Sequence, residues 1–271
     1  MMIILYILLG LIILCLIGLT LNYSFPIPHK NRLPILMYHK VSEDKADGLT
    51  IPVGKLDQQL FFIREKGYTI ITFEELHRMI STGTPLSQKP LILTFDDAYE
   101  NFTTHAVPLL EKYNLKATVF VPVGYMGKTN IWDRGEEPIL GPGILKELSK
   151  TDLIEIGLHS FLHRSYGDLA IEDINEDLAN CINTLDFYKI HFVPVLAYPF
   201  GGFPKKDRTL LAQMKELFRE YNLVFAVRIG NRINPLPVRD PYELKRIDIK
   251  GTDSFFTFKI KLRKGRTKLF S

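Results

Sequence analysis

Two adjacent carboxylates, Asp96 and Asp97, directly follow the short apolar run of residues 91–95. This run comes after Pro90 and is too short for a helix, so it predicts a buried strand. Unpaired carboxylates are costly away from water, so we expect them where the strand leaves the core and meets a metal ion, a cation or solvent. In barrels of alternating strands and helices, active sites lie at this end of the strands. The alternative is an acid pair that caps the next helix.

A pair of histidines, His159 and His163, follows the strand predicted at residues 153–158. Two histidines four residues apart share one side of a helical turn, so both can reach one ion. Surface histidines often fall at this spacing, but this pair lies at a strand end, as the two aspartates do. One carboxylate and two imidazoles leave a coordination position open for water, which is typical of catalytic zinc. The same set also holds Fe(II) or another divalent ion.

A third strand end carries the sequence Tyr198-Pro199-Phe200-Gly201. Proline and glycine stop a strand and expose backbone N–H groups in a loop. Exposed N–H groups beside a metal can stabilise an oxyanion. Taken alone, the segment would favour a plain strand-to-helix turn, and only the other two motifs point to a functional role.

The rest of the chain predicts the elements that position these residues. Strands are predicted at residues 35–39, 68–71, 91–95, 117–121, 153–158, 192–198, 223–227 and 244–249. Helices are predicted at residues 54–66, from a capping box at 72–75, and at 103–113, 143–150, 171–185 and 206–221. Seven or eight strands alternating with helices indicate a parallel α/β fold. Over about 220 residues, a closed or partly closed barrel fits better than an open sheet.

The N-terminal residues 2–21 are apolar and uncharged, which is long enough to cross a bilayer. A cleaved signal peptide would need a basic start and a cleavage site between small residues, and neither is clear here. We therefore expect a transmembrane anchor at 1–22, a proline-containing linker at 23–32, the barrel at 33–255 and a basic tail at 256–271. Lys30, Arg32 and Lys40 follow the apolar run, and this bias alone favours a cytoplasmic domain.

The net charge of +4 is unevenly distributed over the 271 residues. The last sixteen residues carry six Lys and Arg and no acid, so the rest of the chain is slightly acidic. A general nucleic-acid-binding protein would show a basic face on its main domain, so this class is excluded. The two cysteines, Cys15 and Cys181, are poor partners for each other and imply no disulfide framework.

The three motifs together resemble the polysaccharide deacetylase family of nodulation-type carbohydrate esterases. They are Thr94-Phe95-Asp96-Asp97, His159-x-x-x-His163 and Tyr198-Pro199-Phe200-Gly201, and the resemblance extends over about residues 33–250. The third motif, preceded by Ala197, is most similar to that of biofilm poly-N-acetylglucosamine deacetylases. The resemblance implies a distorted (β/α) barrel and a metal-dependent hydrolase that removes N-acetyl groups from N-acetylhexosamine residues of a cell-surface polysaccharide.

The resemblance also implies roles for individual residues. Asp96 would be the general base, and Asp97, His159 and His163 would bind one divalent metal ion. Zinc is the expected ion, and cobalt, nickel or iron are alternatives. The metal would activate a water molecule, and the N–H of Phe200 would help to hold the oxyanion. Strand alternation would send neighbouring aspartates to opposite faces, so this division of labour comes from the family alone.

Three departures from the family pattern leave questions open. The smallest is Ala98, which stands where a glycine often follows the two aspartates. Ala197 stands where the family usually has an arginine that braces the base. Many members place a histidine near the C-terminus as general acid, but no histidine follows His191. Either Asp96 returns the proton itself, or another group such as His39 does, or the enzyme is slow.

Further expectations concern substrate contacts, localisation and rival functions. Tyr198 and Trp132 are candidates for substrate binding, together with His39. Because the family's polymers lie outside the cytoplasmic membrane, we expect the domain on the extracytoplasmic side, against the charge bias. The rival functions are a non-catalytic carbohydrate-binding barrel and a metal-dependent hydrolase of another amide or ester.

Overall fold

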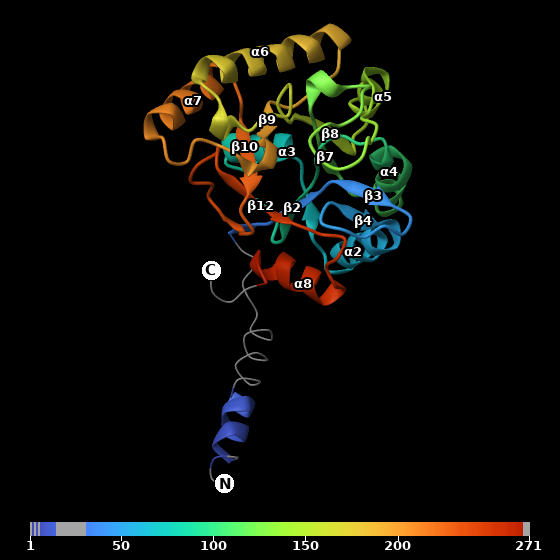
Figure 1. Cartoon of the computed structure of the whole chain (residues 1–271), viewed down its shortest axis with the longest axis vertical. Helices are drawn as coiled ribbons and strands as arrows, with labels where there is room; N and C mark the ends of the chain where they lie inside the picture. Colours follow the sequence, from blue (N-terminus) through green and yellow to red (C-terminus); the bar gives the residue numbers. More distant parts are fainter. Residues whose placement is uncertain (1, 3, 5, 15–30, 268–271) are drawn as a thin grey trace. The chain divides into compact units, whose positions relative to one another are not determined.

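A computed structural model describes residues 2, 4, 6–14 and 31–267 of the chain. The chain divides into two compact units, Met1–Lys30 and Asn31–Ser271. The second unit contains all the strands of the described residues (Figure 1). The strands that could position a functional site therefore belong to the second unit, Asn31–Ser271.

Seven parallel strands close into a barrel in the order β2-β12-β10-β9-β8-β7-β6, with β6 pairing back to β2. These strands are β2 (Ile35–Tyr38), β6 (Pro90–Phe95), β7 (Ala117–Val121), β8 (Ile154–Leu158), β9 (Val195–Ala197), β10 (Phe225–Ile229) and β12 (Leu244–Asp248). An eighth strand, β5 (Thr69–Ile70), pairs with the start of β6 and with no other strand of residues 31–267. The prediction of a parallel α/β barrel with seven or eight strands is confirmed.

Four short strands lie outside the ring. β1 (Arg32–Leu33) pairs antiparallel with β11 (Asn234–Pro235), and β3 (Lys40–Ser42) pairs parallel with β4 (Thr50–Pro52). The β3–β4 pair follows β2 directly and so borders the carboxyl end of the barrel.

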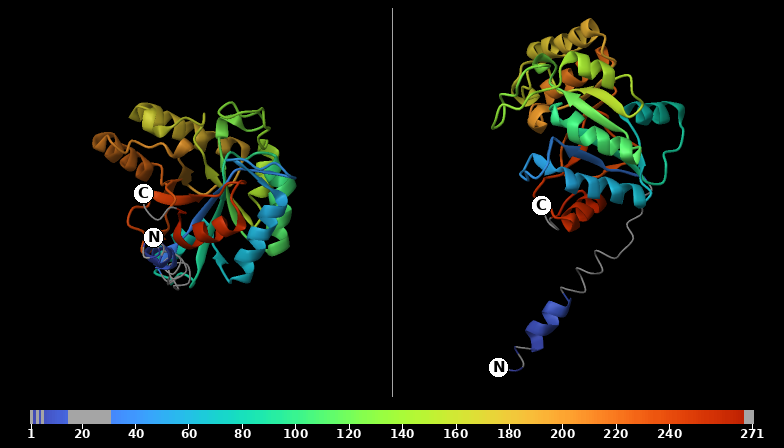
Figure 2. Two further views of the ribbon diagram at one scale, coloured as in Figure 1. Left: turned by 60° about the horizontal axis from the view of Figure 1, so that its bottom comes forward. Right: turned by 90° about the vertical axis from the view of Figure 1, so that its right-hand side faces the viewer.

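Helices surround the strands (Figures 1 and 2). They are α2 (Val53–Glu65), α3 (Phe73–Thr82), α4 (Val107–Tyr113), α5 (Pro142–Leu148), α6 (Ile171–Tyr188), α7 (Arg208–Glu220) and α8 (Phe255–Lys264). Short 3-10 or π turns lie at Phe102–Ala106, Val123–Tyr125, Tyr166–Asp168 and Pro199–Gly201. The predicted capping box is confirmed, because the Thr72 hydroxyl accepts from the Glu75 N–H at 3.1 Å and the Glu75 carboxylate accepts from the Thr72 N–H at 3.0 Å.

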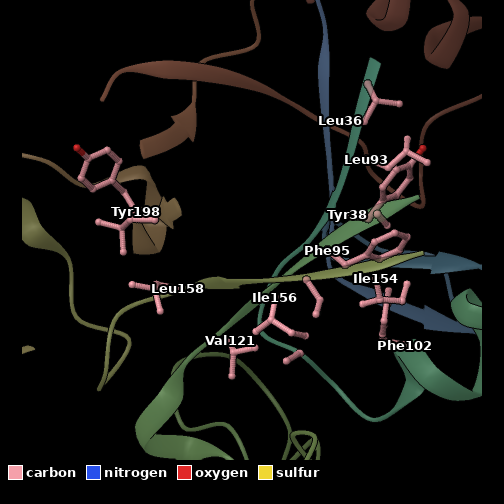
Figure 3. Packing of buried hydrophobic residues seen from close by; sticks show 14 of the residues in the cluster. Leu36, Tyr38, Leu93, Phe95, Phe102, Val121, Ile154, Ile156, Leu158 and Tyr198 are labelled. Atoms are coloured by element: carbon pink, nitrogen blue, oxygen red, sulfur yellow. The ribbon is translucent and has the colours of Figure 1, made fainter. Parts of the chain in front are cut away.

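Alternate residues of the strands form two separate hydrophobic layers. In β6, Ile92 belongs to a cluster with Val195, Phe225 and other strand residues that fills the barrel. Leu91, Leu93 and Phe95 belong to a second cluster that includes the inner faces of the helices. Figure 3 shows Leu93 and Phe95 on this second layer beside Tyr38, whose ring stacks on Phe95 at 5.2 Å between centroids. A continuous apolar run such as 91–95 fits a strand that is buried on both faces.

The predicted transmembrane helix is wrong for the part of the chain that the structure describes. No helix within residues 2, 4, 6–14 and 31–267 is long and apolar enough to cross a membrane. Of the predicted span, residues 2, 4 and 6–14 belong to the described part of the chain. Residues 3, 5 and 15–21 of the span lie outside it. The predicted membrane contact rested on this anchor, and the predicted extracytoplasmic placement included it, so the described residues support neither.

Candidate functional site

The predicted site residues meet at the carboxyl ends of the barrel strands. Asp96 and Asp97 follow β6, His159 follows β8, and the Pro199–Gly201 turn follows β9. A cavity of about 160 Å³ lies there, lined by Met37, His39, Leu49, Asp96, Asp97, Trp132, Asp133, His159, His163, Tyr198, Phe200, Gly201, Ile229, Arg246 and Asp248. A larger cavity, of about 650 Å³, lies around Glu155, Lys116 and His191 near the strand starts and contains none of the predicted site residues. The smaller cavity is therefore the candidate site, because it contains the predicted site residues.

Both neighbouring aspartates face this cavity because the chain leaves strand geometry between them. Asp97 has a φ of 71° and Ala98 a φ of 51°, both in the left-handed region. Non-glycine residues seldom adopt this region, and it costs free energy that the surrounding structure must offset. The turn overrides the alternation expected of a strand, so Asp96 and Asp97 can serve one site.

The two histidines also come together through a loop. Residues 159–163 form no helical turn, and Ser160 and His163 have φ values of 60° and 54°. The expectation that helical spacing aligns the pair is therefore wrong, although the imidazoles do converge, with ring centroids 4.8 Å apart. Asp177 of α6 holds this loop, because its carboxylate accepts from the Phe161 N–H at 3.0 Å.

Asp97, His159 and His163 are all buried and offer three potential ligand atoms within 4.8 Å of one another. Nε2 of His159 lies 3.4 Å, and Nε2 of His163 3.1 Å, from Oδ1 of Asp97. This oxygen makes no hydrogen bond within the described part of the chain. A buried carboxylate oxygen without a hydrogen bond, facing two imidazole nitrogens, fits a bound divalent cation.

The protonation state of His159 suits metal binding. Its Nδ1 lies 2.7 Å from the carbonyl oxygen of Ala197. A carbonyl can only accept, so Nδ1 carries the proton and Nε2 is left as the free donor atom. Burial lowers the pKa of His159 to about 4, against the opposing effect of Asp96. The imidazole is therefore neutral at pH 7 and its Nε2 lone pair is available.

Arg246 of β12 forms a two-pronged ion pair with Asp96. Its Nη1 and Nη2 donate to the two carboxylate oxygens at 2.5 and 2.6 Å, and both side chains are almost completely buried. Burial would raise the pKa of Asp96, but the Arg246 guanidinium and then His159 outweigh it and hold the pKa below its usual range. Asp96 is thus kept ionised. Arg246 thus contacts Asp96 in the way that the resemblance would assign to an arginine at position 197, and no local sequence motif indicated it.

His39 and Phe200 complete the wall of the cavity. Nε2 of His39, at the end of β2, lies 3.8 Å from Oδ2 of Asp96. Phe200 has a φ of 56°, and its exposed ring meets His163 edge-to-face at 4.7 Å between centroids. His39 and Phe200 thus line the same cavity as Asp96.

The two remaining candidate residues make contacts that their sequence did not indicate. Tyr198 is buried and its hydroxyl donates to the carbonyl of Tyr242 at 3.0 Å, so substrate could meet only its ring. Trp132 donates its indole N–H to Oδ2 of Asp97 at 3.3 Å and stacks on His163 at 4.1 Å between centroids. Trp132 therefore contacts two members of the metal-ligand set.

Comparison with known proteins gives a consistent result. Residues 83–217 match the family model described as polysaccharide deacetylase. YxkH of Bacillus subtilis, whose name assigns it to the polysaccharide deacetylases, is 28% identical over 184 residues, which is 68% of this chain and 61% of YxkH. The poly-β-1,6-N-acetyl-D-glucosamine N-deacetylase of Escherichia coli is 33% identical over 101 residues, which is 36% of this chain and 15% of that enzyme. The chain thus spans less than two thirds of the length of either relative.

Solved structures share the fold. The deacetylase PplD of Streptococcus pyogenes superimposes with a TM-score of 0.70 at 24% identity, covering 87% of this chain and 99% of that one. The family match includes β6, β8 and β9, whose carboxyl ends carry the aspartate pair, the histidine pair and the Pro199–Gly201 turn. The chain belongs to the polysaccharide deacetylase family.

Proposed function

We propose that this protein is a metal-dependent hydrolase that removes N-acetyl groups from N-acetylhexosamine residues of a polysaccharide. The observation that carries the proposal is the juxtaposition of an arginine-braced carboxylate, Asp96, with the Asp97–His159–His163 set in one cavity. The E. coli relative's name supports a β-1,6-linked N-acetylglucosamine polymer as the substrate to test first.

Asp97, His159 and His163 would hold the metal. Zinc fits best, because two imidazoles and one carboxylate with an open position form a typical catalytic zinc set, although cobalt, nickel or iron would also accept these ligands. When bound, the ion would polarise the acetamide carbonyl and lower the pKa of a bound water.

Asp96 acts in this proposal as the general base. The Arg246 guanidinium keeps it charged and fixes both its oxygens, so the carboxylate is oriented before substrate arrives. The backbone N–H of Phe200, in the turn after β9, donates to the oxygen that develops negative charge.

His39 is the group best placed to protonate the leaving amine. It lines the same cavity as Asp96, and its Nε2 lies 3.8 Å from the Asp96 carboxylate. With no histidine after His191 in the chain, this position supports His39 over a return of the proton by Asp96 alone. The products are acetate and a free amine on the sugar.

The test is acetate release from chitin oligomers, β-1,6-linked N-acetylglucosamine oligomers and peptidoglycan, with and without a chelator. We expect release from at least one polymer, its loss with chelator and its recovery on adding zinc. His163→Ala, folded but unable to bind the metal, should release no acetate. Binding of an oligomer without acetate release by the zinc-loaded protein would favour the non-catalytic carbohydrate-binding function. Release of acid only from other amides or esters would favour a different hydrolase.

A further inference from the structure

We propose that Trp132 is a positioning residue for the metal ligands, and that Asp133 holds it in place through Lys40 and Tyr99. The inference rests on the metal site of the proposed function. The indole N–H of Trp132 donates to Oδ2 of Asp97, and its ring lies nearly parallel to the His163 imidazole, at 20°. One side chain thus contacts two of the three candidate ligands.

The hydrogen bond from Trp132 distinguishes the two oxygens of Asp97. Oδ2 accepts the indole N–H, whereas Oδ1 faces the imidazoles of His159 and His163 and makes no hydrogen bond within the described residues. An outer partner of this kind fixes the orientation of a ligating carboxylate and tunes its affinity for the metal. Trp132 therefore engages Oδ2 and leaves Oδ1 as the Asp97 oxygen that faces both imidazoles.

Asp133 anchors the segment that carries Trp132. Its carboxylate lies 3.0 Å from the ammonium of Lys40 and accepts from the Tyr99 hydroxyl at 3.1 Å and from the Asn130 amide. Lys40 is buried, and its ammonium also lies over the Tyr99 ring at 4.7 Å from the centroid. A buried lysine needs a compensating charge, so Asp133 is held firmly against the barrel.

The loop of residues 128–139 is also tied to the chain beside the aspartates. The Ile139 N–H donates to the Lys128 carbonyl at 2.8 Å, which closes the base of the loop. The Glu100 N–H donates to the Pro138 carbonyl and the Leu140 N–H to the Ala98 carbonyl, both at 2.9 Å. The loop thus follows the turn that aims Asp97 and presents Trp132 to it.

These contacts favour a positioning role over a sugar-binding platform. His163 covers one face of the indole, and Tyr125 meets it edge-on at 5.0 Å between centroids. A sugar that stacked on the covered face would have to displace a metal ligand.

The experiment is a zinc titration of the metal-free full-length protein. Trp132 is the only tryptophan of the chain, so its fluorescence reports on this site alone. We expect the emission to change and to saturate at one equivalent of zinc. Calorimetry should show that Trp132→Phe, which keeps a ring but loses the N–H, binds zinc about 10–100-fold more weakly. Asp133→Asn should weaken zinc binding in the same direction, read by fluorescence.

Ile131→Ala is the matched control, because Ile131 is the neighbouring loop residue and is 75% exposed. Its zinc affinity should equal that of the wild type, and circular dichroism should show all variants folded. Trp132→Phe and Asp133→Asn change different side chains. If one of them fails to fold, the zinc affinity of the other still tests the inference. Wild-type zinc affinity in Trp132→Phe or in Asp133→Asn would overturn this inference and leave the proposed function intact. A wild-type protein that binds no divalent metal would overturn both.

Discussion

Asp96 is a buried carboxylate whose negative charge has one close guanidinium partner, Arg246. Asp96 lines the cavity, and Arg246 donates hydrogen bonds to both of its carboxylate oxygens. A cation–π contact also stabilises Arg246, because its guanidinium lies over the Phe120 ring at 5.3 Å from the centroid. This arrangement yields two separate predictions, one for turnover and one for stability.

Asp96→Asn should abolish most turnover and leave the metal in place. The amide keeps the size of the side chain but cannot accept a proton, and loss of a general base costs about 10²–10⁴ in rate. The measurements are kcat for acetate release and metal content by elemental analysis. Near-full turnover would show that Asp96 is not the base.

Arg246→Met should destabilise the fold, because it leaves the buried carboxylate of Asp96 without its guanidinium partner. Removing one partner of a buried ion pair typically costs about 3–5 kcal/mol, because the other charge stays uncompensated. In urea unfolding, the double variant Asp96→Asn/Arg246→Met should recover much of that loss. If the two substitutions simply add, the pair is not coupled as the structure indicates.

The sequence predicted the acidic and histidine residues of this site but not their brace. Asp96, Asp97, His159 and His163 stand in short motifs directly after strands, where local pattern reveals them. Arg246 comes from a strand 150 residues away from Asp96, and no local motif links them. The available signal was a charged residue between Leu244 and Asp248 in a strand of a closed barrel, where an inward-facing cation requires a partner.

At the scale of elements, the loop between β8 and α6 determines whether the histidines can act together. Asp177 of α6 accepts hydrogen bonds from the Phe161 N–H and, at 2.7 Å, from the Tyr166 hydroxyl. Helix α6 was predictable from its apolar spacing, but the left-handed residues Ser160 and His163 were not. Periodicity reports which face of an element is buried, and it carries no information on an irregular loop that tertiary contacts hold.

Asp177→Ala should weaken metal binding without removing any ligand. The change leaves the Phe161 N–H without its acceptor, which costs about 1–3 kcal/mol when buried, and it frees the loop that carries His163. We expect zinc affinity to fall about 10–100-fold, as for other outer partners of ligands, measured by calorimetry. Glu176→Ala changes an exposed carboxylate on the same helix and should bind zinc normally. Equal affinities in the two variants would exclude the proposed effect of Asp177 on the loop.

At the scale of the whole molecule, the last barrel strand closes the ring against the first. β12 pairs with β2 and carries Arg246 to Asp96, so the charge of Asp96 is compensated only when the barrel is complete. The order of strands along the chain was predictable, because parallel strands alternate with helices. A closed or partly closed barrel was also predicted, but the pairings of β2 with β12 and β6 that close it were not, since they join residues that are far apart in sequence.

Helix α8 reinforces this closure, within the segment that its composition alone had marked as a basic tail. The Ser254 hydroxyl caps the helix by accepting from the Thr257 N–H at 3.1 Å. The Lys261 ammonium donates to the carbonyl of Asp248, the last residue of β12, at 2.8 Å. Phe258 and Leu262 are buried in the core cluster that includes the inner faces of the helices. The basic residues of α8 are therefore interspersed with apolar residues, Phe258 and Leu262, that pack on the barrel domain.

Phe258→Ala should destabilise the domain far more than Phe256→Ala. Phe258 is fully buried and meets Phe62 of α2 edge-to-face at 6.2 Å between centroids, whereas Phe256 is 54% exposed. Truncating a buried phenylalanine costs about 3–5 kcal/mol, because burial is lost and a cavity remains. Truncating an exposed one removes less buried area and leaves no enclosed cavity. Urea unfolding of both variants measures the difference in free energy of unfolding. If α8 unfolds together with the barrel, zinc binding and the helical circular dichroism signal should be lost in one transition. Equal free energies of unfolding for the two variants would mean that α8 does not pack on the barrel through Phe258.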